Sequence, residues 1–291
     1  MLQMNASPRD AASPSPGTPA DNREFNFSAK DFERVRTLIY QQAGIHLHEG
    51  KQAMVYSRLS RRLRDTQHQS FDSYLQWLER TSGDTAQREW QEFVNCLTTN
   101  LTSFFREEHH FHTLAEWLKA NGSRNLRIWC CAASTGEEPY SIAMVVAETL
   151  GLHANVKIMA SDIDTNVLQT ASRGVYDAQS RGLSPGRLRN FFLRGKGSND
   201  GQIRIKPELG RLIEFKPFNL MQQHWSMGEP FDIVFCRNVM IYFDNATQRK
   251  VLERINGVMR PQGLLFVGHS ENFTDARDLF KLRGKTVYDK A

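Results

Sequence analysis

The stretch LRIWCCAASTGEEPYSIA, residues 126–143, carries the clearest signature of the fold. Its first part, Leu126 to Cys131, is apolar and favours a buried strand, and Ala132 to Gly136 are small residues that suit a tight turn. The apolar spacing that follows predicts a helix around Ile142 to Leu150. A strand, a small-residue turn and a helix in this order are typical of a βαβ unit.

The same alternation continues through the rest of the chain. VKIMASD (156–162) precedes a helix expected around 167–172, and FDIVFCRN (231–238) precedes a helix expected around 246–259. Later strand-like segments are GLLFVGHS (263–270) and KTVYDK (285–290). Apolar strands that alternate with helices predict an α/β fold whose parallel sheet is covered on both faces.

The N-terminal part of the chain has a helical period instead. Ser28 can cap a helix with Asp31 three residues later, and Gly44 marks its end. Four apolar stripes at helical spacing predict a small all-α domain over residues 23–97, followed by an α/β domain over residues 98–291. Residues 1–22, rich in Ala, Ser and Pro, are expected to form a disordered tail without a secretory signal.

Between Gly174 and Phe218 the alternation is interrupted. IRI (203–205) and RLIEF (211–215) look like short strands on either side of Pro207, and the glycine-rich RGKGSNDG (194–201) precedes them. We interpret residues from about 175 to 218 as a small antiparallel β-subdomain inserted into the α/β domain.

Composition narrows the class of protein. The chain has 291 residues, of which 40% are hydrophobic and 24% charged, and no apolar run approaches the ~20 residues that a membrane helix needs. The four cysteines form no C-x-x-C pair, so we expect reduced thiols in a cytoplasmic protein. A net charge of +5 permits an acidic partner without requiring nucleic acid.

The loop after the first strand excludes one familiar ligand class. Ligands of open α/β sheets bind beyond the carboxyl ends of the strands, and Gly136 would let a ligand approach the backbone there. The dinucleotide pattern G-x-G-x-x-G is absent, however, and Glu137 and Glu138 would repel a pyrophosphate. These acids suit a ligand with a cationic end or with hydroxyl donors.

Polar residues after the later strands refine that ligand. Asp162 occupies the place where nucleotide-binding folds put an acid on ribose hydroxyls. Arg237 and Asn238 follow another strand, and Tyr242 comes shortly afterwards. Together these residues predict a pocket for an adenosine that carries a positive charge and no phosphates, which describes S-adenosylmethionine.

Five blocks of sequence then point to one family. They are TTNLTSFFREEHHF (98–111), CAASTGEEPYSIAM (131–144), ASDIDTNVL (160–168), FDIVFCRNVMIYFD (231–244) and GHSEN (268–272). With these blocks the chain resembles the chemotaxis receptor methyltransferases, the CheR family, from about Phe27 to Tyr288. The resemblance implies a helical N-domain joined to a Rossmann-like class I methyltransferase domain with an inserted β-subdomain, in agreement with the pattern above.

The resemblance also implies an activity. Members transfer a methyl group from S-adenosylmethionine to specific glutamate side chains of bacterial chemoreceptors, which yields glutamyl methyl esters and S-adenosylhomocysteine. This chain would then be a cytoplasmic protein-glutamate O-methyltransferase recruited to membrane-bound receptors, whose cytoplasmic helical region is its substrate. No nucleic-acid partner and no membrane insertion are implied.

Matching positions give the implied site residues. The implied cofactor contacts are Asn100, Thr102, Arg106, Gly136, Glu137, Asp162, Asn219, Leu220, Arg237 and Asn238, with Asn219 and Leu220 beside the adenine. Arg106 and Tyr242 are the implied catalytic helpers, Arg106 by orienting the incoming carboxylate and Tyr242 by lying beside the sulfonium. Glu138 is interpreted as structural, and Asp164 as a helix N-cap.

Two surfaces are candidates for receptor docking. Arg58, Arg61, Arg62 and Arg64 lie on one predicted helix, and the first three share a face by their spacing. A receptor helix rich in glutamate could dock there, although a solvated helix face is the alternative. GKGSNDG (195–201) resembles the glycine-bearing loop of members whose β-subdomain adds a receptor C-terminal peptide as a strand.

Some interpretations stay open at this point. A methyltransferase acting on RNA or on a small molecule, or an inactive cofactor-binding scaffold, would share much of this pattern. The run EEHHFH (107–112) contains no H-E-x-x-H, and we expect no metal site. His269 and Glu271 follow a strand end without a role that the sequence defines.

Overall fold

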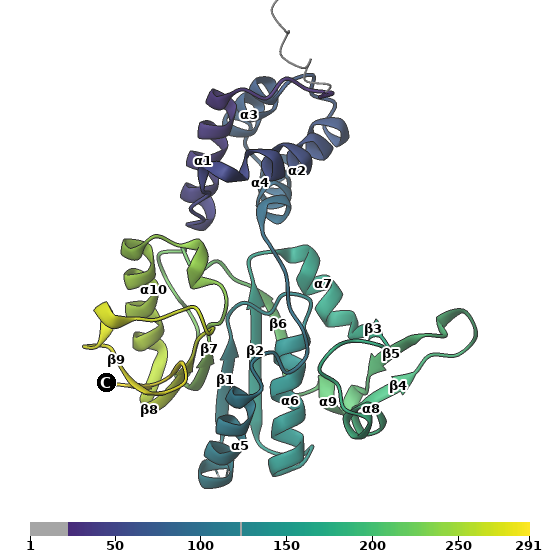
Figure 1. Cartoon of the computed structure of the whole chain (residues 1–291), viewed down its shortest axis with the longest axis vertical. Coiled ribbons are helices and arrows are strands. Elements are labelled where there is room, and N and C mark those ends of the chain that lie inside the picture. The colour runs from purple at the N-terminus through teal and green to yellow at the C-terminus, as the bar shows by residue number, and fades with distance from the viewer. Residues whose placement is uncertain (1–22, 123) are drawn as a thin grey trace, which may run out of the picture.

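A computed structural model describes residues 23–122 and 124–291. The expected tail, residues 1–22, lies outside the described residues. A helical N-terminal domain stands at one end of the molecule, above the sheet of the second domain (Figure 1). Its helices are α1 (Ala29–Ala43), α2 (Gln52–Asp65), α3 (Phe71–Arg80) and α4 (Asp84–Leu97), with the short 3-10 turn η1 (Glu49–Lys51) before α2. The predicted all-α domain is confirmed.

The first helix begins and ends where its sequence predicts. Ser28 and Asp31 form a reciprocal capping box, in which the Asp31 carboxylate accepts a hydrogen bond from the Ser28 backbone at 2.9 Å. Gly44 ends α1 in the left-handed conformation, with φ of 69°. Phe32, Val35 and the other apolar residues of the four stripes form one buried cluster.

The second domain is built on a seven-stranded sheet. Its strands are β1 (Leu126–Cys130), β2 (Val156–Asp162), β6 (Ile213–Pro217), β7 (Phe231–Phe235), β8 (Met259–Phe266), β9 (Phe280–Gly284) and β10 (Val287–Lys290). Their order is β6-β2-β1-β7-β8-β10-β9; the first five run parallel, and β10 is antiparallel to both of its neighbours. The α/β class with a mostly parallel sheet is therefore confirmed.

Helices cover both faces of this sheet. They are α5 (His109–Asn121), α6 (Glu137–Leu150), α7 (Thr165–Arg173) and α10 (Asn245–Val258). Along β1, Ile128 and Cys130 face a core shared with α5 and α6, whereas Trp129 faces a core shared with α10. Because every second side chain points to the opposite face, a continuous apolar strand is buried on both sides. In the described residues, no helix combines the length and apolar character that crossing a bilayer requires.

The insertion is smaller than the sequence predicts. A separate antiparallel sheet has the order β3-β5-β4, with β3 (Val175–Asp177), β4 (Phe192–Arg194) and β5 (Gln202–Ile205), and it projects to one side (Figure 1). Helix α8 (Pro185–Phe191), the short 3-10 turn η2 (Gly197–Asn199) and helix α9 (Pro207–Gly210) accompany it.

The strand IRI is confirmed as part of this antiparallel sheet. The placement of RLIEF in the insertion is wrong, because Ile213 pairs in parallel with Ile158 and β6 forms an edge of the main sheet. The expected boundary near residue 218 therefore includes a strand of the main sheet. A short apolar run does not reveal which strand it will pair with. The partner of residues 213–217 becomes clear only from their pairing with β2 in the folded sheet.

Candidate active site

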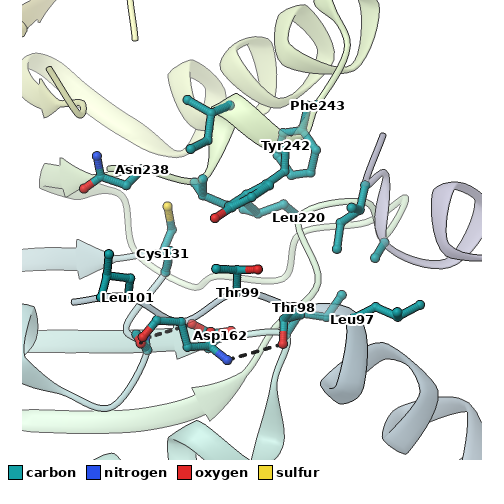
Figure 2. Close-up of a pocket in the computed structure, with 18 of the residues that line it drawn as sticks. Leu97, Thr98, Thr99, Leu101, Cys131, Asp162, Leu220, Asn238, Tyr242 and Phe243 are labelled. Atoms are coloured by element: carbon teal, nitrogen blue, oxygen red, sulfur yellow. Dashed lines mark hydrogen bonds between the residues drawn. The ribbon is translucent and has the colours of Figure 1, made fainter. Parts of the chain in front are cut away.

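A cavity of about 360 Å³ lies between the two domains, at the carboxyl ends of β1, β2 and β7. One wall comes from residues 97–102, which link the domains, and another from residues 43–48, which follow α1. The loops after β1, β2 and β7 complete it (Figure 2). The volume lies within the range of small-molecule sites, and the position is the usual one for a ligand of an open α/β sheet.

Most of the expected site residues meet in this cavity. It is lined by Asn100, Thr102, Arg106, Asp162, Asn219, Leu220, Arg237, Asn238 and Tyr242. The lining residues do not include Gly136 or Glu137. Gly136 has φ of 101°, and a Cβ there would lie 2.6 Å from the Tyr176 hydroxyl, so packing alone requires glycine.

Asp162 lies at the end of β2 and is only 7% exposed. Its Oδ2 accepts a hydrogen bond from the Ser134 backbone at 2.8 Å, and its Oδ1 accepts one from the Asp164 backbone at 3.0 Å. Burial raises the pKa of Asp162 to about 6, although the two backbone donors lower it. These contacts fix the carboxylate at the cavity, where its remaining lone pairs can accept ligand hydroxyls.

Asp164 joins the linker to α7. One of its oxygens caps α7 by accepting from the Asn166 backbone at 2.9 Å, which confirms the predicted N-cap. The other oxygen accepts from Thr98 Oγ1 and Asn100 Nδ2, each at 2.8 Å. Asn100 is therefore held by Asp164 at the edge of the cavity, and the path of the linker follows from these bonds.

A buried group of charges lies beneath the cavity. The guanidinium of Arg237, 1% exposed, pairs with Glu138 through Nη1, and its Nη2 lies 3.4 Å from Glu107 Oε2. The same Nη2 donates to the Arg106 carbonyl at 2.6 Å. Although burial opposes charge, these two carboxylates raise the pKa of Arg237, and Arg237 in turn lowers the pKa of Glu107.

The two adjacent glutamates point to different places. Glu138 lines the cavity and holds Arg237, which agrees with its structural interpretation. Glu137 instead accepts a hydrogen bond from Thr135 Oγ1 at 2.7 Å, and burial raises its pKa. Sequence reasoning could not separate them, because consecutive residues at a helix start project about 100° apart and either could face the ligand.

Glu271 acquires a role that the sequence left open. Its carboxylate accepts hydrogen bonds from the backbone of Gly268 at 2.6 Å, Met240 at 2.8 Å, Asn238 at 2.9 Å and Ile241 at 3.4 Å. Glu271 is 3% exposed and thereby organises the loop after β7. No sequence pattern indicates this, since three of the four donors are backbone groups about 30 residues away.

Tyr242 closes the cavity from the same loop. Figure 2 shows its ring edge-on, with the hydroxyl directed into the cavity. Its carbonyl accepts a hydrogen bond from the His46 backbone at 2.8 Å, and Asn219 Nδ2 donates to the Gln42 carbonyl at 2.7 Å. The wall formed by residues 43–48 is thus attached to the second domain, a contribution to the site that sequence reasoning missed.

The four docking arginines do not form one exposed face. The Arg62 side chain is 15% exposed and binds Glu89 through Nε at 3.0 Å and Nη2 at 2.6 Å. Arg58 donates to the Thr98 carbonyl at 2.6 Å. The Arg61 and Arg64 side chains are 80% and 57% exposed, so only these two are available to a partner. The exposure of these side chains favours Arg61 and Arg64 over Arg62 for docking, and the docking role itself stays a prediction.

One cluster has the composition of a metal site. Ligand atoms of Glu107, His109 and His110 lie within 4.8 Å of one another. The Nε2 atoms of both histidines lie 3.2 Å from the Lys285 carbonyl, and Arg237 is close to Glu107. These contacts attach the β9–β10 turn to α5, so we interpret the cluster as packing. The expected absence of a metal site stays a prediction.

The geometry defines the class of protein. The sheet is parallel except for β10, which is antiparallel and lies between β8 and β9. The ligand cavity lies at the strand ends, Asp162 stands at the end of β2, and the loop after β1 lacks the phosphate-binding glycine pattern. These features together define a methyltransferase-type nucleoside site. The lining fits S-adenosylmethionine: Asp162 can accept ribose hydroxyls, Glu138 adds a second acid to the lining, and Leu220 and Phe218 offer apolar surface to a base.

Comparison with known proteins identifies the family. The family model described as CheR methyltransferase, SAM binding domain, matches residues 100–288, and that of the CheR methyltransferase all-alpha domain matches residues 30–98. The chain is 50% identical to chemotaxis protein methyltransferase 2 of Pseudomonas aeruginosa over 274 residues, 93% of this chain and 96% of that protein. It is 49% identical to the chemotaxis protein methyltransferase of Escherichia coli, over 88% of this chain and 89% of that protein.

The chain therefore belongs to the CheR methyltransferase family, and its cofactor is S-adenosylmethionine. The fold predicted from the resemblance, an all-α N-domain before a Rossmann-like domain with a small antiparallel sheet, is confirmed. It is a methyltransferase of chemotaxis.

Proposed function

We propose that this protein methylates glutamate side chains of chemoreceptors and forms glutamyl methyl esters. The observation that carries the proposal is the placement of cationic and aromatic side chains around a cofactor cavity. Arg106 and Tyr242 line the same cavity as Asp162. An anionic acceptor can thus meet a guanidinium beside the place where the cofactor binds, an arrangement that suits a carboxylate better than a neutral amine.

The reaction requires no proton transfer to or from the protein. When bound, S-adenosylmethionine supplies a methyl group activated by a sulfonium. A glutamate carboxylate, with a reference pKa of about 4.3, is already ionised near neutral pH and requires no general base. The protein contributes by aligning the acceptor and by removing water from two opposite charges.

Named residues have distinct parts in this proposal. Arg106 binds the incoming carboxylate and orients it, and its own Nη1 donates to the Leu101 carbonyl at 3.0 Å, which limits how tightly it can hold the acceptor. Tyr242 directs its hydroxyl into the cavity (Figure 2), and we assign this side chain to the place beside the sulfonium. Asp162 holds the ribose, Asn219 and Leu220 flank the adenine, and Asn238 contacts the methionine part. Asn100 and Thr102 complete the cofactor contacts from the linker.

Receptor docking uses two further surfaces. Arg61 and Arg64 on α2 attract the glutamate-rich helical region of a receptor, and this attraction weakens with salt. In the β-subdomain, β3 and β4 flank β5 as edge strands, and exposed Val175 and Leu193 lie beside the turn at Gly195. A receptor C-terminal peptide that adds a strand there would recruit this cytoplasmic enzyme to the membrane-bound receptor.

Incubation with methyl-tritiated S-adenosylmethionine and receptor-containing membranes tests the proposal. We expect label in the receptor band that is released as volatile methanol by mild base, the behaviour of a methyl ester. An Asp162→Ala variant serves as the control for cofactor-dependent transfer. Base-stable label, or label in RNA instead of the receptor, would show that the acceptor is not a glutamate carboxylate.

A further inference from the structure

Two large apolar side chains are exposed at the mouth of the cavity. Among the described residues, seven large apolar side chains are exposed, and Leu101 at 81% is the most exposed of them. Only Leu101 and Ile241, which is 51% exposed, also line the interdomain cavity. Scattered exposed apolar residues are ordinary, but two at one functional opening call for a partner that covers them.

The backbone of both residues is anchored, so their exposure is built into the fold. The Leu101 carbonyl accepts from Arg106 at 3.0 Å, and the preceding Asn100 is bound to Asp164. The Ile241 backbone donates to buried Glu271 at 3.4 Å. These bonds hold the backbone of both residues at the cavity mouth, and the described part of the chain leaves both side chains exposed.

The surroundings indicate the chemistry of that partner. Arg106 lies beside Leu101, and another wall carries the exposed side chains of His46, His48 and Lys51. An apolar pair in a rim that carries the cations Arg106 and Lys51 fits an anionic side chain flanked by aliphatic ones. On a helix, residues three or four positions from a glutamate share its face and would meet such a rim.

We propose that Leu101 and Ile241 are specificity-determining residues that contact aliphatic side chains one helical turn from the target glutamate. The inference rests on the proposed function and names its substrate class: a helix that presents a carboxylate with an apolar residue on the same face. Arg106 selects the carboxylate of the target glutamate, and Leu101 and Ile241 select the aliphatic residues next to it on the helix face. The cofactor is the competing occupant, because a nucleoside in the cavity could also cover Leu101.

Serine variants separate these occupants. We compare Leu101→Ser and Ile241→Ser with the control Leu282→Ser, whose side chain on β9 is 62% exposed and lies outside the cavity lining. Three quantities are measured: the dissociation constant of S-adenosylhomocysteine by calorimetry, the affinity for a receptor cytoplasmic fragment, and KM and kcat for methylation. A thermal melt of each variant checks folding.

The proposal predicts a selective loss. Leu101→Ser should weaken fragment binding and raise KM roughly tenfold, as expected when a buried leucine contact is lost, while kcat and S-adenosylhomocysteine affinity stay within twofold. Replacing the aliphatic residue one turn from the target glutamate by serine should weaken wild-type binding but add little in Leu101→Ser. Leu282→Ser should behave as wild type.

Other outcomes overturn it. If Leu101→Ser weakens S-adenosylhomocysteine binding and leaves fragment affinity and KM unchanged, the cofactor covers this side chain. If all constants match wild type, neither residue contributes to recognition. Fragment binding by wild type without methylation would refute the proposed function alone and leave the docking inference standing. A wild-type protein that neither binds nor methylates the fragment refutes both.

Discussion

Arg237 and Glu138 form an ion pair beneath the cavity, and through it the end of β7 is bound to the first turn of α6. The same guanidinium donates to the Arg106 carbonyl at 2.6 Å, so the pair also sets the position of Arg106. Because Arg237 is buried among carboxylates, we interpret its main contribution as holding Arg106 in place. The Nε atom of Arg237 is buried and has no hydrogen-bond partner among the described residues.

Glu138→Gln should therefore disturb the position of the Arg106 side chain while leaving that side chain in the site. We expect methylation kcat to fall roughly tenfold, because a neutral amide holds Arg237 less strongly than a carboxylate does. In an Arg106→Ala background the same change should cost less than about twofold, since the positioned group is already gone. Equal losses in both backgrounds would contradict positioning through Arg106. Glu137→Gln is the matched comparison, expected to have the smaller effect on kcat because Glu137 does not line the cavity.

Cofactor affinity should depend on pH through Asp162. The ionised carboxylate accepts ribose hydroxyls, and burial raises its pKa to about 6. We expect S-adenosylhomocysteine to bind roughly tenfold more weakly at pH 5 than at pH 7. Calorimetry measures this directly, and Asp162→Asn should bind weakly at both pH values with little dependence on pH. Other titratable groups also line the cavity, so a pH dependence that persists in Asp162→Asn would show that Asp162 is not its source.

The raised pKa of Asp162 affects stability in the opposite direction, because acid weakens cofactor binding but favours the folded, ligand-free protein. Folding raises the pKa of Asp162, so the protonated carboxyl is the form that the fold favours. In the ligand-free protein, its contribution to stability is fully present below about pH 4 and is lost as the pH rises through about 6. Relative to Asp162→Asn, the wild-type melting temperature should decline over this window, and a difference that does not change with pH would contradict the raised pKa.

Arg61 and Arg62, neighbours on α2, should respond differently to mutation. Arg61→Glu should raise the receptor KM several-fold at low salt with an unchanged melting temperature, because its side chain is 80% exposed. Arg62→Ala should lower the free energy of unfolding by about 3 kcal/mol, because Glu89 would be left buried without its cation. Kinetics at two salt concentrations and urea denaturation distinguish these roles. An Arg62→Ala variant with unchanged stability and a raised KM would contradict a structural role for Arg62 and support a docking role.

Glu271→Ala should destabilise the loop that carries Asn238 and Tyr242. Four backbone donors would lose a buried charged acceptor, which we expect to cost about 3 kcal/mol in the free energy of unfolding. Cofactor affinity should fall as well, because the loop lines the cavity. Glu253→Ala on the exposed side of α10 provides a control, and denaturant titration of both variants gives the comparison. An unfolding free energy equal to wild type would show that the loop does not depend on Glu271.

The sequence predicted best where a single local pattern decides the structure. The capping box at Ser28, the apolar strands before Ala132 and Asp162, and the N-cap at Asp164 each depend on a few neighbouring residues. Strand β9 was missed because its turn to β10 uses Lys285 and Thr286 with positive φ, where asparagine or glycine would be the usual signal.

Positions after strand ends indicated Asp162, Arg237 and Asn238, and the resemblance supplied Asn100, Thr102 and the rest, but neither predicted the contacts that hold the site together. The pairing of Arg237 with Glu138 joins positions 99 apart, and three of the four donors to Glu271 come from the distant loop after β7. Burial of Arg62 depends on Glu89, which lies on another helix. Such contacts depend on tertiary packing, and helical spacing alone predicted a shared arginine face that the N-domain core does not leave exposed.

A crystal structure of the protein with S-adenosylhomocysteine is the most direct test of the cofactor site. We expect the nucleoside between the domains, with ribose hydroxyls within hydrogen-bond distance of Asp162 and the adenine beside Leu220. Nucleoside density at any other place, with the Asp162 carboxylate directed away from it, would show that Asp162 does not bind the cofactor.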